Sequence, residues 1–93
     1  MKRMELVADR SIEKEVITAL RDNINEFYYS LLPQIPGNEK PNYKSKTDIW
    51  PNLHFLLISF LEDDEAYKAK IIISDFKQQF PDGGIKLFFM DAR

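Results

Sequence analysis

Apolar side chains follow two different spacings along this chain, and the change between them marks the expected elements. Residues 4–8 are mostly apolar and predict a short first strand. The next apolar positions recur every four residues, with charged residues between them, which predicts an amphipathic helix. These positions are Ile12, Val16, Leu20 and Ile24. Asp9 and Ser11 stand just before this stripe and offer side-chain oxygens as N-caps.

Two further strands are predicted in the middle of the chain. Residues 27–32 are aromatic and apolar and predict a second strand, whose far end Pro33 and Pro36 confine to a sheet edge or a turn. Residues 37–51 are polar and without period, which indicates a long loop. Residues 53–61 are apolar at both parities and predict a long third strand at a central position.

The last third of the chain predicts a helix and a final strand. Glu62, Asp63, Asp64 and Glu65 supply acids where the first turn of a helix favours them. The expected buried face of this helix consists of Ala69, Ile72, Ile73, Phe76 and Phe80. The turn over residues 81–84 ends the helix, and residues 85–90 predict a fourth strand, again apolar at both parities.

The predicted order of elements is β-α-β-β-α-β over one domain, residues 1–93. This order predicts an α+β, ferredoxin-like sandwich, in which a four-stranded antiparallel sheet carries two helices on one face. Adjacent apolar pairs occur in three strands: Tyr28 with Tyr29, Leu56 with Leu57, and Phe88 with Phe89. The face of the sheet away from the helices is therefore expected to be apolar and covered by other copies, which predicts a homo-oligomer. Irregular patterning in short strands is the simpler alternative.

Composition narrows the possible functions. The 93 residues include no cysteine, which excludes disulfides, thiolate metal sites and cysteine nucleophiles. A net charge of −2 offers no basic footprint for nucleic acid. The longest apolar runs, residues 55–58 and 87–90, are too short to span a membrane, and no signal peptide is recognised. A cytoplasmic protein without direct membrane insertion is expected.

The element order and the position of the long loop, with a glycine turn before the last strand, resemble the PII-like proteins, a family of trimeric signalling proteins whose architecture CutA shares. The run from Asp82 to Phe88, Asp-Gly-Gly-Ile-Lys-Leu-Phe, is similar to the phosphate-contacting turn and strand of nucleotide-binding members. The short branch associated with heavy-metal efflux is the most similar. The turn lacks the Thr-Gly that precedes it in the family, so the identity of the ligand, a nucleotide included, stays open.

The resemblance implies a regulatory protein rather than an enzyme. It implies a trimer that senses a small ligand at its subunit interfaces, through Asp82, Gly83, Gly84 and Lys86. It also implies contact with a partner protein, such as a membrane transporter or an enzyme, through the loop over about residues 37–51. The loop residues expected to make this contact are Lys40, Tyr43, Lys44, Lys46 and Trp50.

Each of these groups also has a simpler interpretation. The glycine turn can merely end a helix, Lys86 and the loop lysines can be solvated, and Trp50 can pack at the entry of the third strand. His54 is the one histidine of the chain, and no serine, cysteine or carboxylate is placed by motif to act with it, so a non-catalytic strand histidine is expected. The four acids after residue 61 lack the spacing of a calcium loop and are explained by helix capping.

Three other functions share this fold class. An ACT-like module would bind a small molecule at a dimer interface. A small enzyme on a dimeric ferredoxin-like barrel would need a deep pocket with a perturbed titratable group, and only His54 is at hand. An RNA-recognition module would need a basic and aromatic run on its third strand, which residues 53–58 do not supply.

Overall fold

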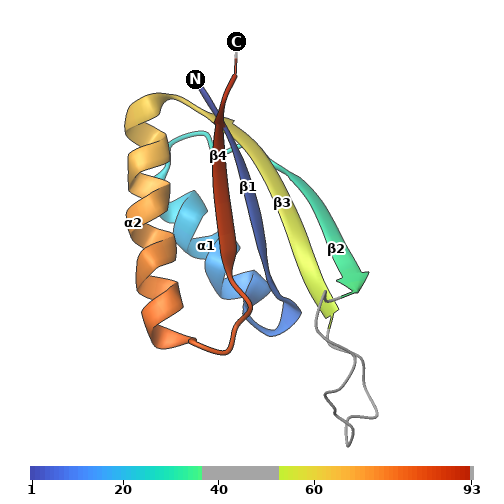
Figure 1. Ribbon diagram of the computed structural model, residues 1–93. Helices are drawn as coiled ribbons and strands as arrows, with labels where there is room; N and C mark the ends of the chain where they lie inside the picture. Colours follow the sequence, from blue (N-terminus) through green and yellow to red (C-terminus); the bar gives the residue numbers. More distant parts are fainter. Residues whose placement is uncertain (37–52, 93) are drawn as a thin grey trace, which may run out of the picture.

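A computed structural model describes residues 1–36 and 53–92, and within them it has the predicted architecture. The elements are β1 (Lys2–Asp9), a 3-10 turn η1 (Arg10–Ile12), α1 (Glu13–Asn23), β2 (Ser30–Pro36), β3 (Leu53–Leu61), α2 (Asp63–Gln79) and β4 (Lys86–Asp91). All paired strands are antiparallel, in the order β2-β3-β1-β4. Both helices cover one face of this sheet (Figure 1). The ferredoxin-like α+β fold is thus confirmed, with β3 in a central position.

The hydrophobic core lies between the helices and the inner face of the sheet. Alternate residues of β1 and β3 are fully buried there, among them Leu6, Phe55 and Leu57. The four-residue stripe predicted for the first helix is buried throughout. Because burial of one large aliphatic side chain stabilises a fold by roughly 1.5–3 kcal/mol, this two-layer packing determines which face of each element points inward.

The start of α2 forms as its acids predict, whereas the cap predicted for the first helix serves the 3-10 turn η1, and Ile12, the N-cap of α1, makes no side-chain hydrogen bond. Asp9 is the N-cap of η1, and its carboxylate accepts a hydrogen bond from the Ser11 amide at 2.9 Å. At the start of α2 the Glu62 amide donates to the Glu65 carboxylate at 3.4 Å, and three acids occupy the first turn. Carboxylates at these positions satisfy amide groups that have no partner within the helix.

Several boundaries and one burial differ from the prediction. The first strand spans Lys2–Asp9 and not only residues 4–8. The second strand starts at Ser30 instead of residue 27 and continues through both prolines to Pro36, with an irregular register between Leu32 and Ile35. An edge strand tolerates this because proline lacks the N–H that a central strand must donate. The last strand begins at Lys86, one residue later than predicted. Phe80, predicted to be buried, is 38% exposed because α2 ends at Gln79, and it stacks on Phe76 at 6.0 Å.

The chain termini lie at one end of the sheet, and the turn between α2 and β4 lies at the other (Figure 1). At one end the described chain begins and finishes side by side, where the Ala92 amide donates to the Met1 carbonyl at 3.0 Å (Figure 1). An exposed ion pair between Lys2 and Asp91 joins the same strands. At the other end of β1, the Asp9 amide donates to the Gly83 carbonyl at 2.8 Å, which ties the turn between α2 and β4 to the sheet.

Candidate functional site: an open sheet face and a glycine turn

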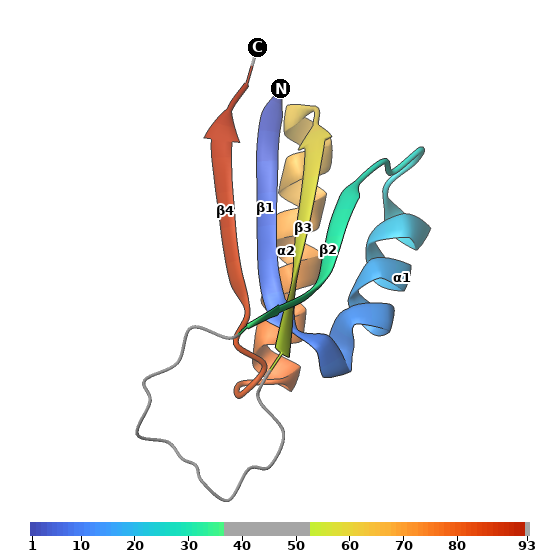
Figure 2. The ribbon, with the colours of Figure 1, turned by 90° about the vertical axis from the view of Figure 1, so that its right-hand side faces the viewer.

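The face of the sheet away from the helices, here called the open face, is largely apolar. Figure 2 views the sheet from this side, with β2 and β4 at its two edges. Strand register places on it Arg3, Glu5, Val7, Ser30, Leu32, His54, Leu56, Ile58, Phe60, Lys86, Phe88 and Met90. Leu32, Phe60, Phe88 and Met90 are between 41% and 53% exposed. The prediction of an apolar second face is thus confirmed for the described strands.

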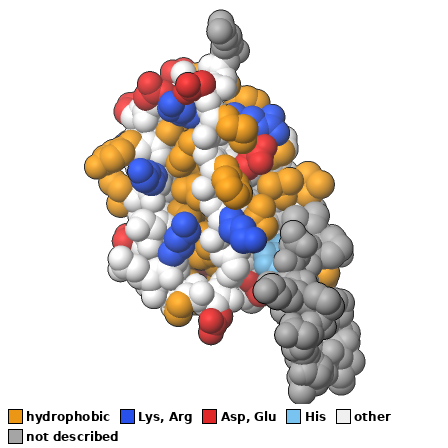
Figure 3. All heavy atoms as spheres, viewed as in Figure 1, with side chains coloured by type: hydrophobic (Ala, Val, Ile, Leu, Met, Phe, Trp, Pro, Cys, Tyr) orange, Lys and Arg blue, Asp and Glu red, His pale blue; other side chains and the backbone are white. Residues whose placement is uncertain are grey.

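The space-filling view from the β4 side shows how apolar this edge of the molecule is. Hydrophobic side chains lie on both sides of β4, towards α2 and towards the open face, with Lys and Arg side chains scattered between them (Figure 3). On the α2 side, Leu87 and Phe89 are only partly buried against the core. The residues of β4 therefore contribute to both faces, as adjacent apolar pairs in the sequence predicted.

One ion pair lies in the middle of the open face. Arg3 Nε donates to Glu5 Oε2 at 2.9 Å, two residues apart on the central strand β1. The Arg3 guanidinium also lies 5.7 Å from the centre of the Phe60 ring, within the range of a cation–π contact. The pair separates the apolar residues of β2 and β3 from those of β4. The sequence did not reveal it, because the first strand was predicted to begin at residue 4, which left Arg3 outside it.

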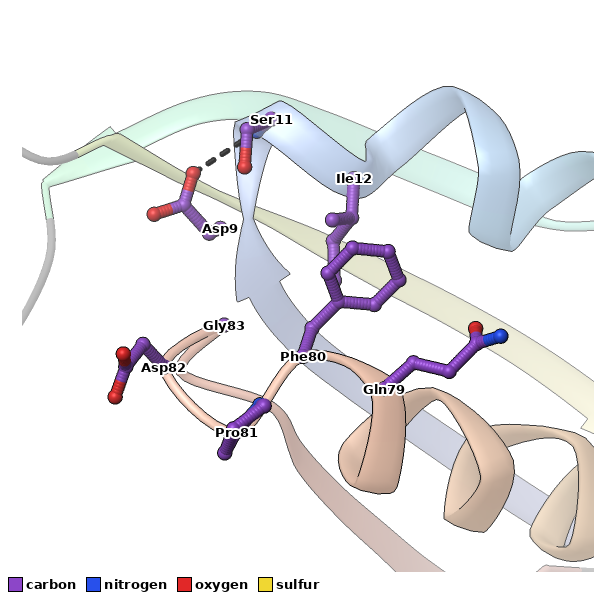
Figure 4. Close-up of a pocket in the computed structure, with 8 residues that line it drawn as sticks. All are labelled: Asp9, Ser11, Ile12, Gln79, Phe80, Pro81, Asp82 and Gly83. Carbon is purple, nitrogen blue, oxygen red and sulfur yellow. Dashed lines mark hydrogen bonds between the residues drawn. The ribbon is translucent and has the colours of Figure 1, made fainter.

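A shallow hollow of about 310 Å³ lies at the glycine-turn end of the molecule. Its lining comes from the end of β1 and η1 on one side and from the end of α2 and the following turn on the other: Asp9, Ser11, Ile12, Gln79, Phe80, Pro81, Asp82 and Gly83. Figure 4 shows the Phe80 ring beside Ile12, and the dashed hydrogen bond that joins Asp9 to Ser11. The hollow thus combines an apolar floor with carboxylates at its rim.

The residues predicted to bind a ligand are divided between this hollow and the sheet. Asp82 and Gly83 line the hollow. The Gly83 amide donates to the Phe80 carbonyl at 2.9 Å, so it is already used within the turn. Lys86 lies opposite Val7 on the open face, is exposed, and is not among the residues that line the hollow.

The charge of the hollow bears on which ligands it suits. Its described lining holds two carboxylates, Asp9 and Asp82, and no lysine or arginine. A phosphate placed there would meet negative charge, which raises the free energy of binding unless basic groups come from elsewhere. The described lining of the hollow alone therefore does not favour an anion.

Gly84 makes a close contact that patterning could not locate. Its φ angle is +62°, a left-handed conformation that side-chain-bearing residues adopt at a cost. A Cβ built on Gly84 would lie 2.7 Å from Nε2 of His54, whose side chain is 5% exposed. Conformation and space both require glycine here, and the glycine backbone rests against the imidazole.

The whole loop between β2 and β3, residues 37–52, lies outside the described residues. The predicted contact residues of this loop lie there too: Lys40, Tyr43, Lys44, Lys46 and Trp50. Within residues 1–36 and 53–92 there is no cluster of three or more side chains that could hold a metal ion. In the same part of the chain, neither helix has the length and apolar character needed to cross a bilayer.

Comparison with known proteins identifies the fold. No protein-family model matches the sequence, and no curated protein matches it either. Among solved structures, a PII-like signalling protein from Thermus thermophilus superposes with a TM-score of 0.69, covering 98% of this chain and 85% of its own, at 13% identity. CPII from Thiomonas intermedia bound to ADP, AMP and acetate superposes at 0.66, covering 98% and 84%, at 13% identity.

The apo form of the same Thiomonas protein, described as a nitrogen regulatory PII-like protein, also gives a TM-score of 0.66. It covers 98% of this chain and 87% of its own, at 15% identity. CPII has further been solved with ADP and bicarbonate. At these identities the likeness establishes the fold: the chain has the fold of PII-like signalling proteins over nearly its whole length.

Proposed function

We propose that this protein is a PII-like regulator, not an enzyme, that assembles as a trimer and senses a small ligand at its subunit boundaries. The apolar open face is the observation that supports the proposed assembly. Four of its large apolar side chains are about half exposed, and burial of apolar surface is the main driving force for association. Three copies that turn these faces towards one another would remove this surface from water.

The two sides of the open face are unlike, which favours a ring over a two-fold dimer. Towards β2 and β3 the face carries Leu32 and Phe60, whereas towards β4 it carries Phe88, Met90 and Lys86. A two-fold interface pairs a patch with itself, whereas a ring pairs two different patches head to tail. The difference between the two sides supports the second arrangement and a closed trimer.

The hollow beside the glycine turn supports the ligand-sensing part of the proposal. Its lining supplies carboxylates and no positive charge for a phosphate. At a subunit boundary, a neighbouring copy would supply the missing basic group. The PII-like protein CPII was solved with ADP, AMP and bicarbonate, so these are the first ligands to try. In this proposal the segment over about residues 37–51 contacts a partner protein, either a membrane transporter or an enzyme, in the cytoplasm.

Solution mass measured by light scattering, with and without ADP, tests the assembly. A mass of about three chains is expected in each condition. A monomer in every condition would contradict the proposal, and a dimer would favour the ACT-like alternative. Isothermal titration calorimetry with ADP and AMP then tests ligand sensing separately. Absence of heat with both, on a confirmed trimer, would leave an assembly that does not sense nucleotides.

A further inference from the structure

His54 lies where three parts of the chain converge. It is the second residue of β3, its Cα is paired with that of Asp9 at the end of β1, and its imidazole touches the backbone of Gly84 in the turn before β4. In the sheet, β1 lies between β3 and β4, so β3 and the turn before β4 are not neighbours in the ladder of hydrogen bonds. The imidazole therefore reaches across the end of β1 to make this contact.

The contact leaves little room for independent movement. Gly84 has no side chain, so its backbone can approach the ring, and a single added carbon would come within 2.7 Å of Nε2. On the other side of the turn, the Gly83 carbonyl accepts from the Asp9 amide at 2.8 Å. The turn is thus held between β1, through a backbone hydrogen bond, and β3, through the histidine. Close-packed interiors transmit small displacements because they contain few voids to absorb them.

The ligand hollow and this contact share the same turn. Asp82 and Gly83 line the hollow, and Gly84, the next residue, rests on His54. A ligand that presses on or draws in the turn at residues 82–83 must move Gly84, and Gly84 cannot move towards β3 without moving the imidazole.

We propose that His54 is a positioning residue for the glycine turn, and that it passes the displacement caused by a bound ligand to the start of β3. This inference rests on the proposed ligand site beside Gly83. It assigns no chemistry to the histidine: the ring acts as a rigid, nearly buried spacer between two elements that no backbone hydrogen bond connects. The imidazole is planar and has two side-chain torsions, so it can transmit a shift that a flexible chain would absorb.

The single histidine makes the test direct. Because His54 is the one histidine in the sequence, both ring-nitrogen signals of a ¹⁵N-labelled sample belong to it. ADP is titrated into the wild-type protein at constant pH, and the ring nitrogens are followed together with the Gly83 amide. We expect the ring signals to shift and to reach half their change at the same ADP concentration as that amide.

Two results would overturn the inference, and they differ in what else they overturn. If the Gly83 amide shifts and the ring nitrogens do not, the turn binds ADP but His54 does not follow it, and the proposed ligand site survives. If neither shifts and calorimetry detects no heat, the ligand site fails, and the inference that rests on it fails with it.

A variant tests the transmission itself. In His54→Ala, ADP should still shift the Gly83 amide, whereas the ADP-dependent shift of the Leu56 amide on β3 should be lost. Ser59→Ala is the matched control, because Ser59 is on the same strand but faces the helices and hydrogen-bonds the Tyr28 carbonyl at 2.6 Å. An unchanged Leu56 response in His54→Ala contradicts the proposal. Should that variant not fold, the wild-type ring titration decides alone.

Discussion

The contact between Gly84 and His54 predicts a specific non-additivity in stability. In Gly84→Ala the new Cβ costs about 1–2 kcal/mol for the left-handed backbone and roughly 1–3 kcal/mol for overpacking against the ring. Reduced freedom of the unfolded chain returns about 0.4–1 kcal/mol. The expected loss is therefore about 1–4.6 kcal/mol in the free energy of unfolding. His54→Ala removes the atom that the Cβ would strike, at Nε2.

The double variant isolates the overpacking part of that loss. In the presence of His54→Ala, the additional cost of Gly84→Ala should fall by about 1–3 kcal/mol, because only the backbone strain remains. Urea unfolding followed by circular dichroism, at one protein concentration for all variants, measures each free energy. A fixed concentration is needed because assembly contributes to apparent stability.

Gly83→Ala is the matched control for this cycle. Its Cβ would meet the Phe80 carbonyl at 3.1 Å, the Phe80 Cβ at 3.3 Å and Ile12 Cδ1 at 3.4 Å, and no atom of His54 is among its three nearest contacts. Its coupling energy with His54→Ala should therefore be smaller than that of Gly84→Ala, because its Cβ does not strike the ring. If Gly84→Ala were equally additive with His54→Ala, the close contact would carry no energy and the reasoning would be refuted.

Three further predictions concern assembly, ligand charge and pH. Phe88→Glu on the open face should reduce the solution mass measured by light scattering. Tyr67→Glu is the control, at an aromatic residue of α2 that is 65% exposed, and it should leave the mass unchanged. Equal masses for the two variants would argue against the open face as the interface. Asp82→Asn should strengthen ADP binding by up to about fivefold in calorimetry, because it removes one negative charge at the rim of the hollow. Asp75→Asn on α2 is the control and should not change the affinity. A weaker affinity in Asp82→Asn would contradict the charge argument. The hydrogen bond and charge of Lys2 lower the pKa of the Asp91 carboxyl. The small stabilisation from this pair is therefore present at neutral pH and is lost as the pH falls through that lowered pKa. If NMR showed Asp91 titrating at or above the ordinary pKa of an aspartate, the pair would not form in solution.

Local patterns were enough to predict most of the architecture. The four-residue stripe beginning at Ile12 specified a helix and its buried face, because helical period and apolar spacing coincide. The apolar run over residues 53–61 specified a central strand with the bounds that the structure has. The second strand was placed three residues too early, because the aromatic residues before Ser30 favour strand as strongly as the leucines within it, and because prolines were taken as its end.

Less of the candidate site than of the fold could be predicted from the sequence. The apolar open face followed from adjacent apolar pairs, which a single chain reveals. By contrast, the packing of Gly84 on His54 and the Arg3–Phe60 contact join segments that are far apart in the sequence. Such contacts depend on strand register and on the path of a turn, which no local pattern specifies. A paired glycine indicated a turn, but not which of the two needs its left-handed conformation.

The pairing of Met1 with Ala92 has a practical consequence for labelling. Both ends of the described chain leave the sheet beside each other, and β1 extends for eight residues, roughly 25 Å, before it reaches the glycine turn. A fluorophore or affinity tag attached at either end of the described chain therefore lies far from the hollow and from the His54 imidazole. Purification and spectroscopic tags can be placed there while the opposite end stays free for binding measurements.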